Sequence, residues 1–518
     1  MTDAAAEATR YDLRLVPAAV TGWVITAAGV LWPVGVPMTA LCAVIAVGAA
    51  VASRCLTSRA VSLAVLAAAA VGVGFGIAVT MRDNAIRDHP VTQSMGRQVE
   101  ATVLVTESPR VVGGSRMLIR ADLRLLNDRN IRGRIIIFAS VRDFGEVTAG
   151  QSVRLRARIG PPTRRDLTLA VFTATGRPTI GPATAVQRGA QALRSRLAEL
   201  AREVLPPDQA ALLPALALGD TSGLSPVLVK DFRTSGLTHL TAVSGANVTI
   251  VCGAVLLSAV LVGPRIAVAL AAVVLVAFVV VVQPTASVLR AAVMGAIALV
   301  AIVSSRRRQA IPALAATVIG LLAVAPQLAV DIGFLLSVSA TAALVVLAPI
   351  WSQRLVGHGW PKPVADAVCV ATAAQLVTAP LVAGISGAFS VVAVVANVLV
   401  APVIAPITVL GTTAAAVCLV MPGVGALLVR FSGPELWWLL SVSQWSAGIP
   451  HAAVPVPSGF AGAAVVAAAT VGTVLLWRLL STRIALAALV ICLLAWLISG
   501  CTDGRLTGLS AGHGTIIE

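Results

Sequence analysis

Long apolar runs recur along most of the chain, and one long stretch between them alternates apolar and polar residues instead. A run of about 20 apolar residues crosses the roughly 30 Å of bilayer hydrocarbon as a helix. We therefore predict a polytopic α-helical membrane protein with about 11–12 spans. The clearest expected spans are 16–36, 38–53, 60–80, 241–262, 266–282, 286–302, 311–325, 329–350, 364–382, 461–477 and 484–498. Weaker patterns at 391–420, expected to make two passes, and at 424–440 complete the candidates.

The stretch after residue 80 alternates with period two, which is typical of half-buried strands. Five strands are expected, at 98–107, 115–126, 133–141, 152–160 and 167–174, separated by Gly, Asn, Asp and Pro turn signals. Five short strands in about 80 residues predict a small inserted β-barrel, with an OB-like fold as the leading candidate. In the fourth strand one face is apolar, and the other is the row Arg154, Arg156 and Arg158.

Arginines near the first spans set the expected orientation. Arg10 and Arg14 precede the first span, and Arg54 and Arg59 precede the third, so the positive-inside rule puts both sites in the cytoplasm. The β domain then lies outside, and we read no removable signal peptide in the first run. The expected organisation is transmembrane helices at 1–80, an extracytoplasmic basic OB-like domain at 81–185, an amphipathic interfacial helix at 186–207, a transmembrane channel domain at 208–499, and a polar tail at 500–518.

Composition and charge sharpen this picture. Of 518 residues, 58% are apolar and 12% charged, which excludes an ordinary soluble domain. The net charge is +16, and residues 81–203 hold 21 Arg against 11 Asp plus Glu, an excess of +10. That excess favours a polyanion such as DNA over a merely solvated face. With few aromatic residues, binding is expected to be electrostatic and sequence-tolerant. The expected DNA-binding surface comprises Arg120, Arg124, Arg154, Arg156 and Arg158.

The cysteines and histidines argue against metal chemistry. Seven cysteines and five histidines are scattered without a C-x-x-C pair or a clustered histidine motif. We therefore expect no metal site, no cofactor and no catalytic residue in this chain.

Polar residues gather where three apolar runs begin. His239, Ser244 and Asn247 open one run, while Arg290 and Asp331 follow Pro284 and Pro326 in two others. If Arg306–Arg308 mark a cytoplasmic loop, both charges lie about 8 to 9 Å below the outer membrane face. Charged groups at such depth usually face a partner or a water-filled cavity, so these residues are expected to line an outer vestibule. The alternative is a snorkelling arginine and a helix-capping histidine.

Four ordered motifs carry a family resemblance. "ALALGDTSGL…FRTSGLTHLTAVSGANV", "PTASVLRAAVM", "DIGFLLSVSAT" and "AAQLVTAPL…VANVLVAP" resemble the ComEC family, the inner-membrane DNA channel of natural transformation. The resemblance implies a vestibule formed by Asp220, His239, Ser244, Asn247, Arg290, Asp331, Ser337, Thr341 and Gln375. Two departures stand out. Many relatives have a second histidine where this chain has Asn247, and many carry a C-terminal metallo-β-lactamase-like domain whose H-x-H-x-D-H motif this chain lacks.

We therefore expect a multi-pass protein of the bacterial inner membrane that conducts single-stranded DNA into the cytoplasm. Its expected partners are DNA, the lipid bilayer, a separate nuclease and DNA-receptor proteins, with a cytoplasmic motor ATPase as a further candidate. Two alternatives remain open. One is a secondary transporter of another acidic polymer or a lipid precursor, and the other is an intramembrane hydrolase using Ser244 and His239. Five residues apart, those two side chains lie about 140° apart on an ideal helix, which disfavours the hydrolase.

Overall fold

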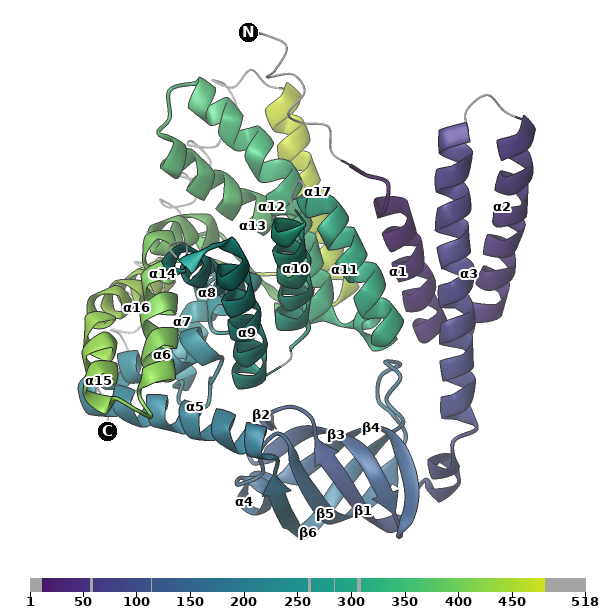
Figure 1. Ribbon diagram of the computed structural model, residues 1–518, viewed down its shortest axis with the longest axis horizontal. Coiled ribbons are helices and arrows are strands. Elements are labelled where there is room, and N and C mark those ends of the chain that lie inside the picture. Colours follow the sequence, from purple (N-terminus) through teal and green to yellow (C-terminus); the bar gives the residue numbers. More distant parts are fainter. Residues whose placement is uncertain are drawn as a thin grey trace, which may run out of the picture.

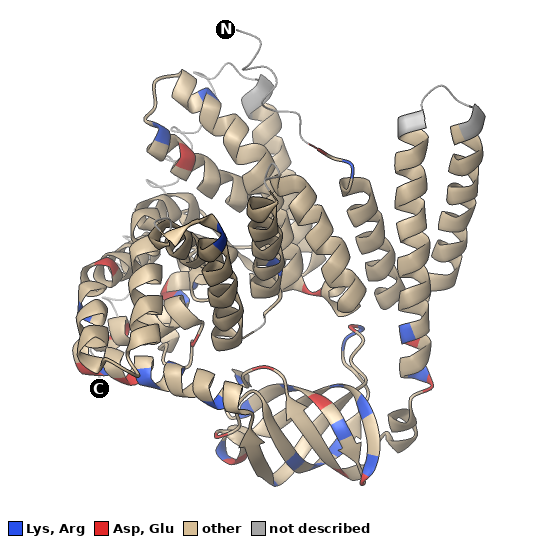
Figure 2. Cartoon of the chain, viewed as in Figure 1, with Lys and Arg blue, Asp and Glu red and all other residues tan. Residues whose placement is uncertain are grey.

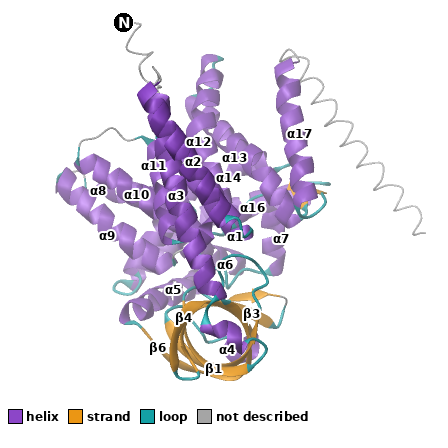
Figure 3. Cartoon of the chain, turned by 90° about the vertical axis from the view of Figure 1, so that its right-hand side faces the viewer, coloured by secondary structure: helices purple, strands orange, loops and turns teal. Residues whose placement is uncertain are grey.

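The computed structural model describes residues 12–55, 59–112, 114–259, 262–283, 285–304 and 309–479. It consists mostly of helices, with one six-stranded sheet inserted after the third helix. The sheet lies at one end of the helical bundle, and the helix that follows it runs across that end (Figures 1 and 3). The expected span 484–498, the loop Arg306–Arg308 and the tail 500–518 lie outside the described residues.

Apolar helices form the body of the molecule. Seven of those described are long and apolar enough to cross a membrane, and four shorter apolar helices accompany them. The α2–α3 hairpin lies to one side of the other helices in Figure 1, and few residues of α2 are buried. The helices are α1 Val16–Leu31, α2 Gly35–Cys55, α3 Arg59–Arg87, α5 Ala185–Val204, α6 Pro207–Leu218, α7 Pro226–Thr234, α8 Gly245–Ser258, α9 Pro264–Val282, α10 Ala286–Val303, α11 Ala310–Val324, α12 Ile332–Gly357, α13 Lys362–Ser386, α14 Ala393–Val417, α15 Pro422–Phe431, α16 Gly433–Gly448 and α17 Phe460–Leu479.

Strands of the insert pair in a ring. Strand β1 pairs with both β3 and β5, and the order β1–β5–β6–β4–β3 returns to β1. All of these pairings are antiparallel except β4 with β6, and the short helix α4 (Val141–Phe144) joins β4 to β5. The strands are β1 Gln98–Val105, β2 Arg110–Val112, β3 Arg116–Leu126, β4 Arg129–Ser140, β5 Gln151–Gly160 and β6 Ala170–Ala183, and a separate pair consists of β7 Ala388–Ser390 and β8 Ala453–Pro455.

The predicted alternation in the fourth strand is confirmed. In β5 the apolar side chains from Val153 to Ile159 are buried, and the three arginines between them are exposed. The core inside the ring of strands contains Phe144 and Phe172, and both side chains are almost completely buried. Two strand predictions need correction. Strand β2 was not expected, and the last strand continues to Ala183 because Gly176 and register shifts let it bend along β5.

Several expected spans begin or end at other residues. The 391–420 region is the single helix α14 rather than two passes, since Pro402 and Pro406 are accommodated inside one continuous helix. The 424–440 region is divided at Ser432 between α15 and α16. The helices expected from 241 and 329 start later because short 3-10 turns, Thr238–Leu240 and Pro326–Val330, precede α8 and α12.

Hydrogen bonds fix the sheet to the bundle. The backbone N–H of Ser108 donates to Oε1 of Gln283 at the end of α9 (2.9 Å). Arg165, in the loop before β6, donates to the carbonyl of Leu31 at the end of α1 (3.1 Å). Arg82 of α3 donates to the carbonyl of Ala323 in α11 (3.3 Å). The insert is therefore held against the bundle at the ends of α9 and α1, while the Arg82 bond joins α3, the helix that leads into the insert, to α11.

Truncation of Phe172 to alanine should open the sheet. Removing a fully buried aromatic side chain costs about 3–5 kcal/mol of unfolding free energy through lost transfer energy and the cavity left behind. Proteolysis of the purified protein should cut residues 98–183 much faster in Phe172→Ala. The matched control Phe460→Ala removes a ring that is 90% exposed and should leave cleavage unchanged. Equal resistance in both variants would contradict the buried role of Phe172.

Candidate functional site

One large cavity of about 2650 Å³ is lined by residues of both the sheet and the helical bundle. Its wall is built mainly by α8, α10, α11, α12, α13 and α14 together with strands and loops of the sheet that face the bundle. Of the nine expected vestibule residues, the cavity wall includes His239, Ser244, Arg290, Asp331, Ser337, Thr341 and Gln375. Asp220 and Asn247 are not part of this wall.

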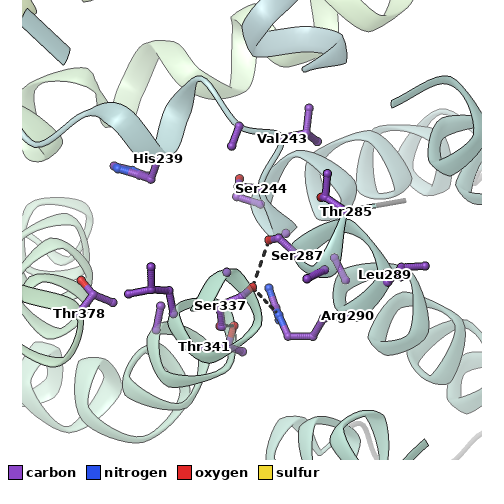
Figure 4. A pocket seen from close by; sticks show the side chains of 18 of the residues that line it. His239, Val243, Ser244, Thr285, Ser287, Leu289, Arg290, Ser337, Thr341 and Thr378 are labelled. Atoms are coloured by element: carbon purple, nitrogen blue, oxygen red, sulfur yellow. Dashed lines mark hydrogen bonds between the residues drawn. The ribbon is translucent and has the colours of Figure 1, made fainter. Parts of the chain in front are cut away.

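Arg290 belongs to a polar network centred on Ser337 in Figure 4. Its Nε donates to Oγ of Ser337 (2.7 Å), and that oxygen lies 3.1 Å from Oγ of Ser287. Its Nη1 contacts Sδ of Met294 (3.3 Å), and only 6% of the residue is exposed. Ser287 was not among the expected residues, although its spacing of three residues from Arg290 puts both on one face of a helix. Arg290 and Ser287 on α10 thus face Ser337 on α12 across the cavity wall.

Asp331 caps a helix instead of lying within one. Its Oδ1 accepts a hydrogen bond from the backbone N–H of Phe334 (2.7 Å), which makes it the N-cap of α12. The expected depth assumed a continuous helix from Pro326, but residues Pro326–Val330 form a 3-10 turn before α12 begins. Arg290 and Asp331 do not form an ion pair within 4.0 Å in the described structure.

His239 and Ser244 share the cavity wall but do not contact each other. The His239 ring points away from Ser244 in Figure 4, and Oγ of Ser244 instead donates to Oδ1 of Asn247 (3.0 Å). Asn247 is buried and donates to the carbonyl of Leu216 at the end of α6 (2.8 Å). Ser244 thus lacks a histidine base in the described residues, and Asn247 ties α8 to α6 behind the wall.

Asp220 lies beside a buried arginine outside the cavity. Its Oδ1 accepts hydrogen bonds from the backbone N–H (3.1 Å) and Oγ (2.6 Å) of Ser222, which fixes the turn after α6. Burial lowers the pKa of the Arg194 guanidinium on α5, and the nearby charge of Asp220 raises it in part. Asp220 therefore stabilises the turn after α6 and interacts electrostatically with Arg194 on α5.

Two further expected residues occupy the α12 and α13 walls. The hydroxyl of Thr341 donates to the carbonyl of Ser337 one turn earlier (2.9 Å), and Nε2 of Gln375 donates to the carbonyl of Ser390 (3.5 Å). Oγ of Ser390 in turn donates to the carbonyl of Thr234 (2.7 Å). Gln375 thereby connects the β7–β8 pair to the cavity.

The cavity wall changes from polar to apolar along its length. On α10 and α12 the polar residues lie near the helix starts, and on the oppositely directed α13 they lie toward its end. The Ser108–Gln283 bond places the end of α9, directly before α10, against the sheet. The far half is lined mainly by small or branched apolar side chains, among them Ile297, Ala298, Ile302, Ala313, Leu344, Val345, Ala367, Val370 and Ala371.

The sheet contributes a second set of arginines to the cavity. Of the five arginines expected to bind DNA, only Arg120 lines it, and its guanidinium is paired with Glu107 (2.7 Å). The other cavity-lining arginines of the sheet were not expected, and they are Arg110, Arg134, Arg164 and Arg165. Figure 2 shows basic residues spread over much of the sheet. The "PPTRRDL" loop, with two adjacent arginines after a proline pair, was the available signal for Arg164 and Arg165.

The row on β5 is exposed but partly neutralised. Arg154 pairs with Glu100 (2.9 Å) and Asp128 (3.6 Å). The hydrogen bond to Glu100 and the charges of both carboxylates raise the pKa of Arg154. Arg156, Arg158 and Arg124 are exposed on the sheet and lie outside the cavity wall. The row therefore offers two uncompensated guanidinium groups rather than three.

Metal ligands do not cluster within the part of the chain that the structure describes: no group of three or more His, Cys, Asp or Glu side chains comes together there. The cavity instead offers hydroxyl, amide and guanidinium groups at one end and an apolar wall at the other.

Comparison with known families agrees with the motifs. The family model described as "Competence protein" matches residues 216–481, just over half of the 518 residues. No curated protein and no solved structure matches the chain. The matched region contains most of the helical wall of the cavity, from α7 to α14, while Leu31 of α1 lies outside it. The chain therefore belongs to the competence protein family, as its four ordered motifs indicated.

Proposed function

We propose that this protein is a channel of the bacterial inner membrane that admits single-stranded DNA to the cytoplasm. Its family is associated with DNA uptake. The observation that carries the proposal is one cavity of about 2650 Å³ whose lining includes sheet arginines, the polar cluster around Arg290, and the far halves of α10 and α12. A phosphate chain needs such a hydrated, hydrogen-bonding and cationic path to leave water for a bilayer.

We further propose that the inserted sheet is an OB-like barrel on the outer side that receives DNA. Two features support it: the closed ring of five strands with a parallel β4–β6 pair, and a short helix between the third and fourth strands of that ring. The role is transport, and strand degradation is assigned to a separate nuclease.

Deletion of the gene should abolish transformation, and expression of this chain should restore it. Cells are given labelled DNA and scored separately for surface-bound and nuclease-protected label. Uptake of a labelled lipid precursor is measured in the same cells as the control. Protected DNA that is unchanged in the deletion strain, or a defect confined to the lipid precursor, would overturn the DNA channel in favour of another transport role.

A further inference from the structure

The guanidinium of Arg290 lacks an acidic partner. It is 6% exposed, and no described carboxylate lies within 4.0 Å of it. Its side-chain hydrogen bonds go to a serine hydroxyl and a methionine sulfur. Burying a charge without a counter-charge is strongly destabilising. An anion from outside the chain, bound in the cavity beside Arg290, would supply the missing counter-charge.

A second positive group adjoins it. Gly245 is the first residue of α8, and a Cβ placed on it would lie 2.7 Å from Nη2 of Arg290. The guanidinium therefore lies against the backbone at the N-terminus of a 14-residue helix. That end carries partial positive charge, so a cation there is unfavourable unless an anion is bound between them.

The N-cap side chain of α8 makes no hydrogen bond to the first turn. The hydroxyl of Ser244 donates to Oδ1 of Asn247, and of the first-turn N–H groups that of Asn247 is bonded to the backbone carbonyl of Ser244 (3.2 Å). The first-turn N–H groups of α8 thus lack the side-chain acceptor that most helices have. Ser287 and Ser337 supply two further hydroxyls beside the guanidinium, and both line the cavity.

We propose that Arg290, the N-terminus of α8 and the hydroxyls of Ser287 and Ser337 form a binding site for one phosphodiester group. The choice of a phosphodiester over another oxyanion rests on the proposed function, since this site lies on the path assigned to DNA. The site occupies the polar half of the cavity, before the wall becomes apolar. Each phosphate of the strand is held there in turn as its hydration water is replaced by protein donors.

Dimethyl phosphate, the smallest phosphodiester monoanion, tests the site without DNA. Its ³¹P line width is titrated with purified full-length protein in detergent. Gly245→Ala inserts a methyl group against Nη2 of Arg290, whereas the control Gly320→Ala adds a methyl that meets nothing within 4 Å. Arg290→Lys keeps the charge but loses the planar fork. We expect about ten-fold weaker binding for Gly245→Ala, a smaller loss for Arg290→Lys, and wild-type binding for Gly320→Ala.

The same variants are scored for nuclease-protected DNA in cells. This second measurement distinguishes a failure of the phosphate site from a failure of the proposed DNA-channel function. Weaker binding together with reduced DNA uptake supports both. Weaker binding with normal uptake keeps the phosphate site and removes it from the DNA path. Equal line broadening by Gly245→Ala and Gly320→Ala overturns the site, whatever uptake shows. Thermal unfolding of each variant in detergent confirms that only folded protein is compared.

Discussion

Replacing Ala340 with tryptophan is expected to reduce nuclease-protected DNA to background while surface-bound DNA is unchanged. Ala340 lies on the cavity face of α12, in the same lining as Ser337 before it and Thr341 and Leu344 after it. An indole at this position projects into the path where the wall passes from polar to apolar. Passage requires the whole strand to move through this part of the cavity, so one large side chain blocks every nucleotide.

The matched control is Leu335→Trp on the same helix. Leu335 is 37% exposed and does not line the cavity, so its indole points away from the path. Cells expressing either variant are given labelled DNA, and protein levels are compared by immunoblot. Normal protection in Ala340→Trp, or an equal loss in Leu335→Trp, would show that DNA does not travel along this face of α12.

The apolar half of the cavity bears on ion leakage only if the proposed channel is correct. A wide, fully polar channel would leak ions, whereas an apolar constriction expels water and closes to ions without a moving lid. The lining residues Leu344, Val345 and Ala371 are apolar. The wall thus combines polar groups near the sheet with apolar side chains toward the other end.

The strands were predictable from the sequence because side chains in a strand alternate strictly between two faces. The β5 alternation therefore gave both its buried and its exposed residues correctly. The starts of α8 and α12 were less predictable, since hydropathy does not distinguish a 3-10 turn such as Pro326–Val330 from an α-helix. Asp331 directly before an apolar run was an N-cap signal that would have placed the start of α12.

The site was only partly predictable. Local polarity at the starts of apolar runs indicated His239, Ser244 and Arg290, and all three line the cavity. The hydrogen-bond partner of Arg290 could not be predicted from the sequence, because Ser337 is 47 residues away and the contact depends on how α10 packs beside α12. The cavity-facing arginines were missed for the same reason. Strand alternation shows that arginines point outward, but not which part of a closed sheet faces the bundle.

Reversing the cavity-facing charge of the sheet is expected to lower DNA capture and uptake by about ten-fold or more at physiological salt. The variant combines Arg110→Glu, Arg134→Glu and Arg164→Glu, three exposed arginines on the cavity wall. Capture by dispersed arginines depends on phosphate neutralisation and counterion release. Losing three contacts to a single strand should therefore make the dependence of log affinity on log salt concentration shallower by about 2.

The matched control reverses three exposed arginines outside the cavity, Arg124, Arg156 and Arg158, so both variants change the net charge equally. Proteolysis of the sheet verifies folding in each. We expect the control to keep most of its capture, because a general loss of positive charge is a weaker effect than loss of the groups that face the path. Equal losses would show that DNA is attracted by the whole domain surface. A loss confined to the control variant would identify the β5 face as the capture surface and place the cavity-facing arginines outside the DNA path.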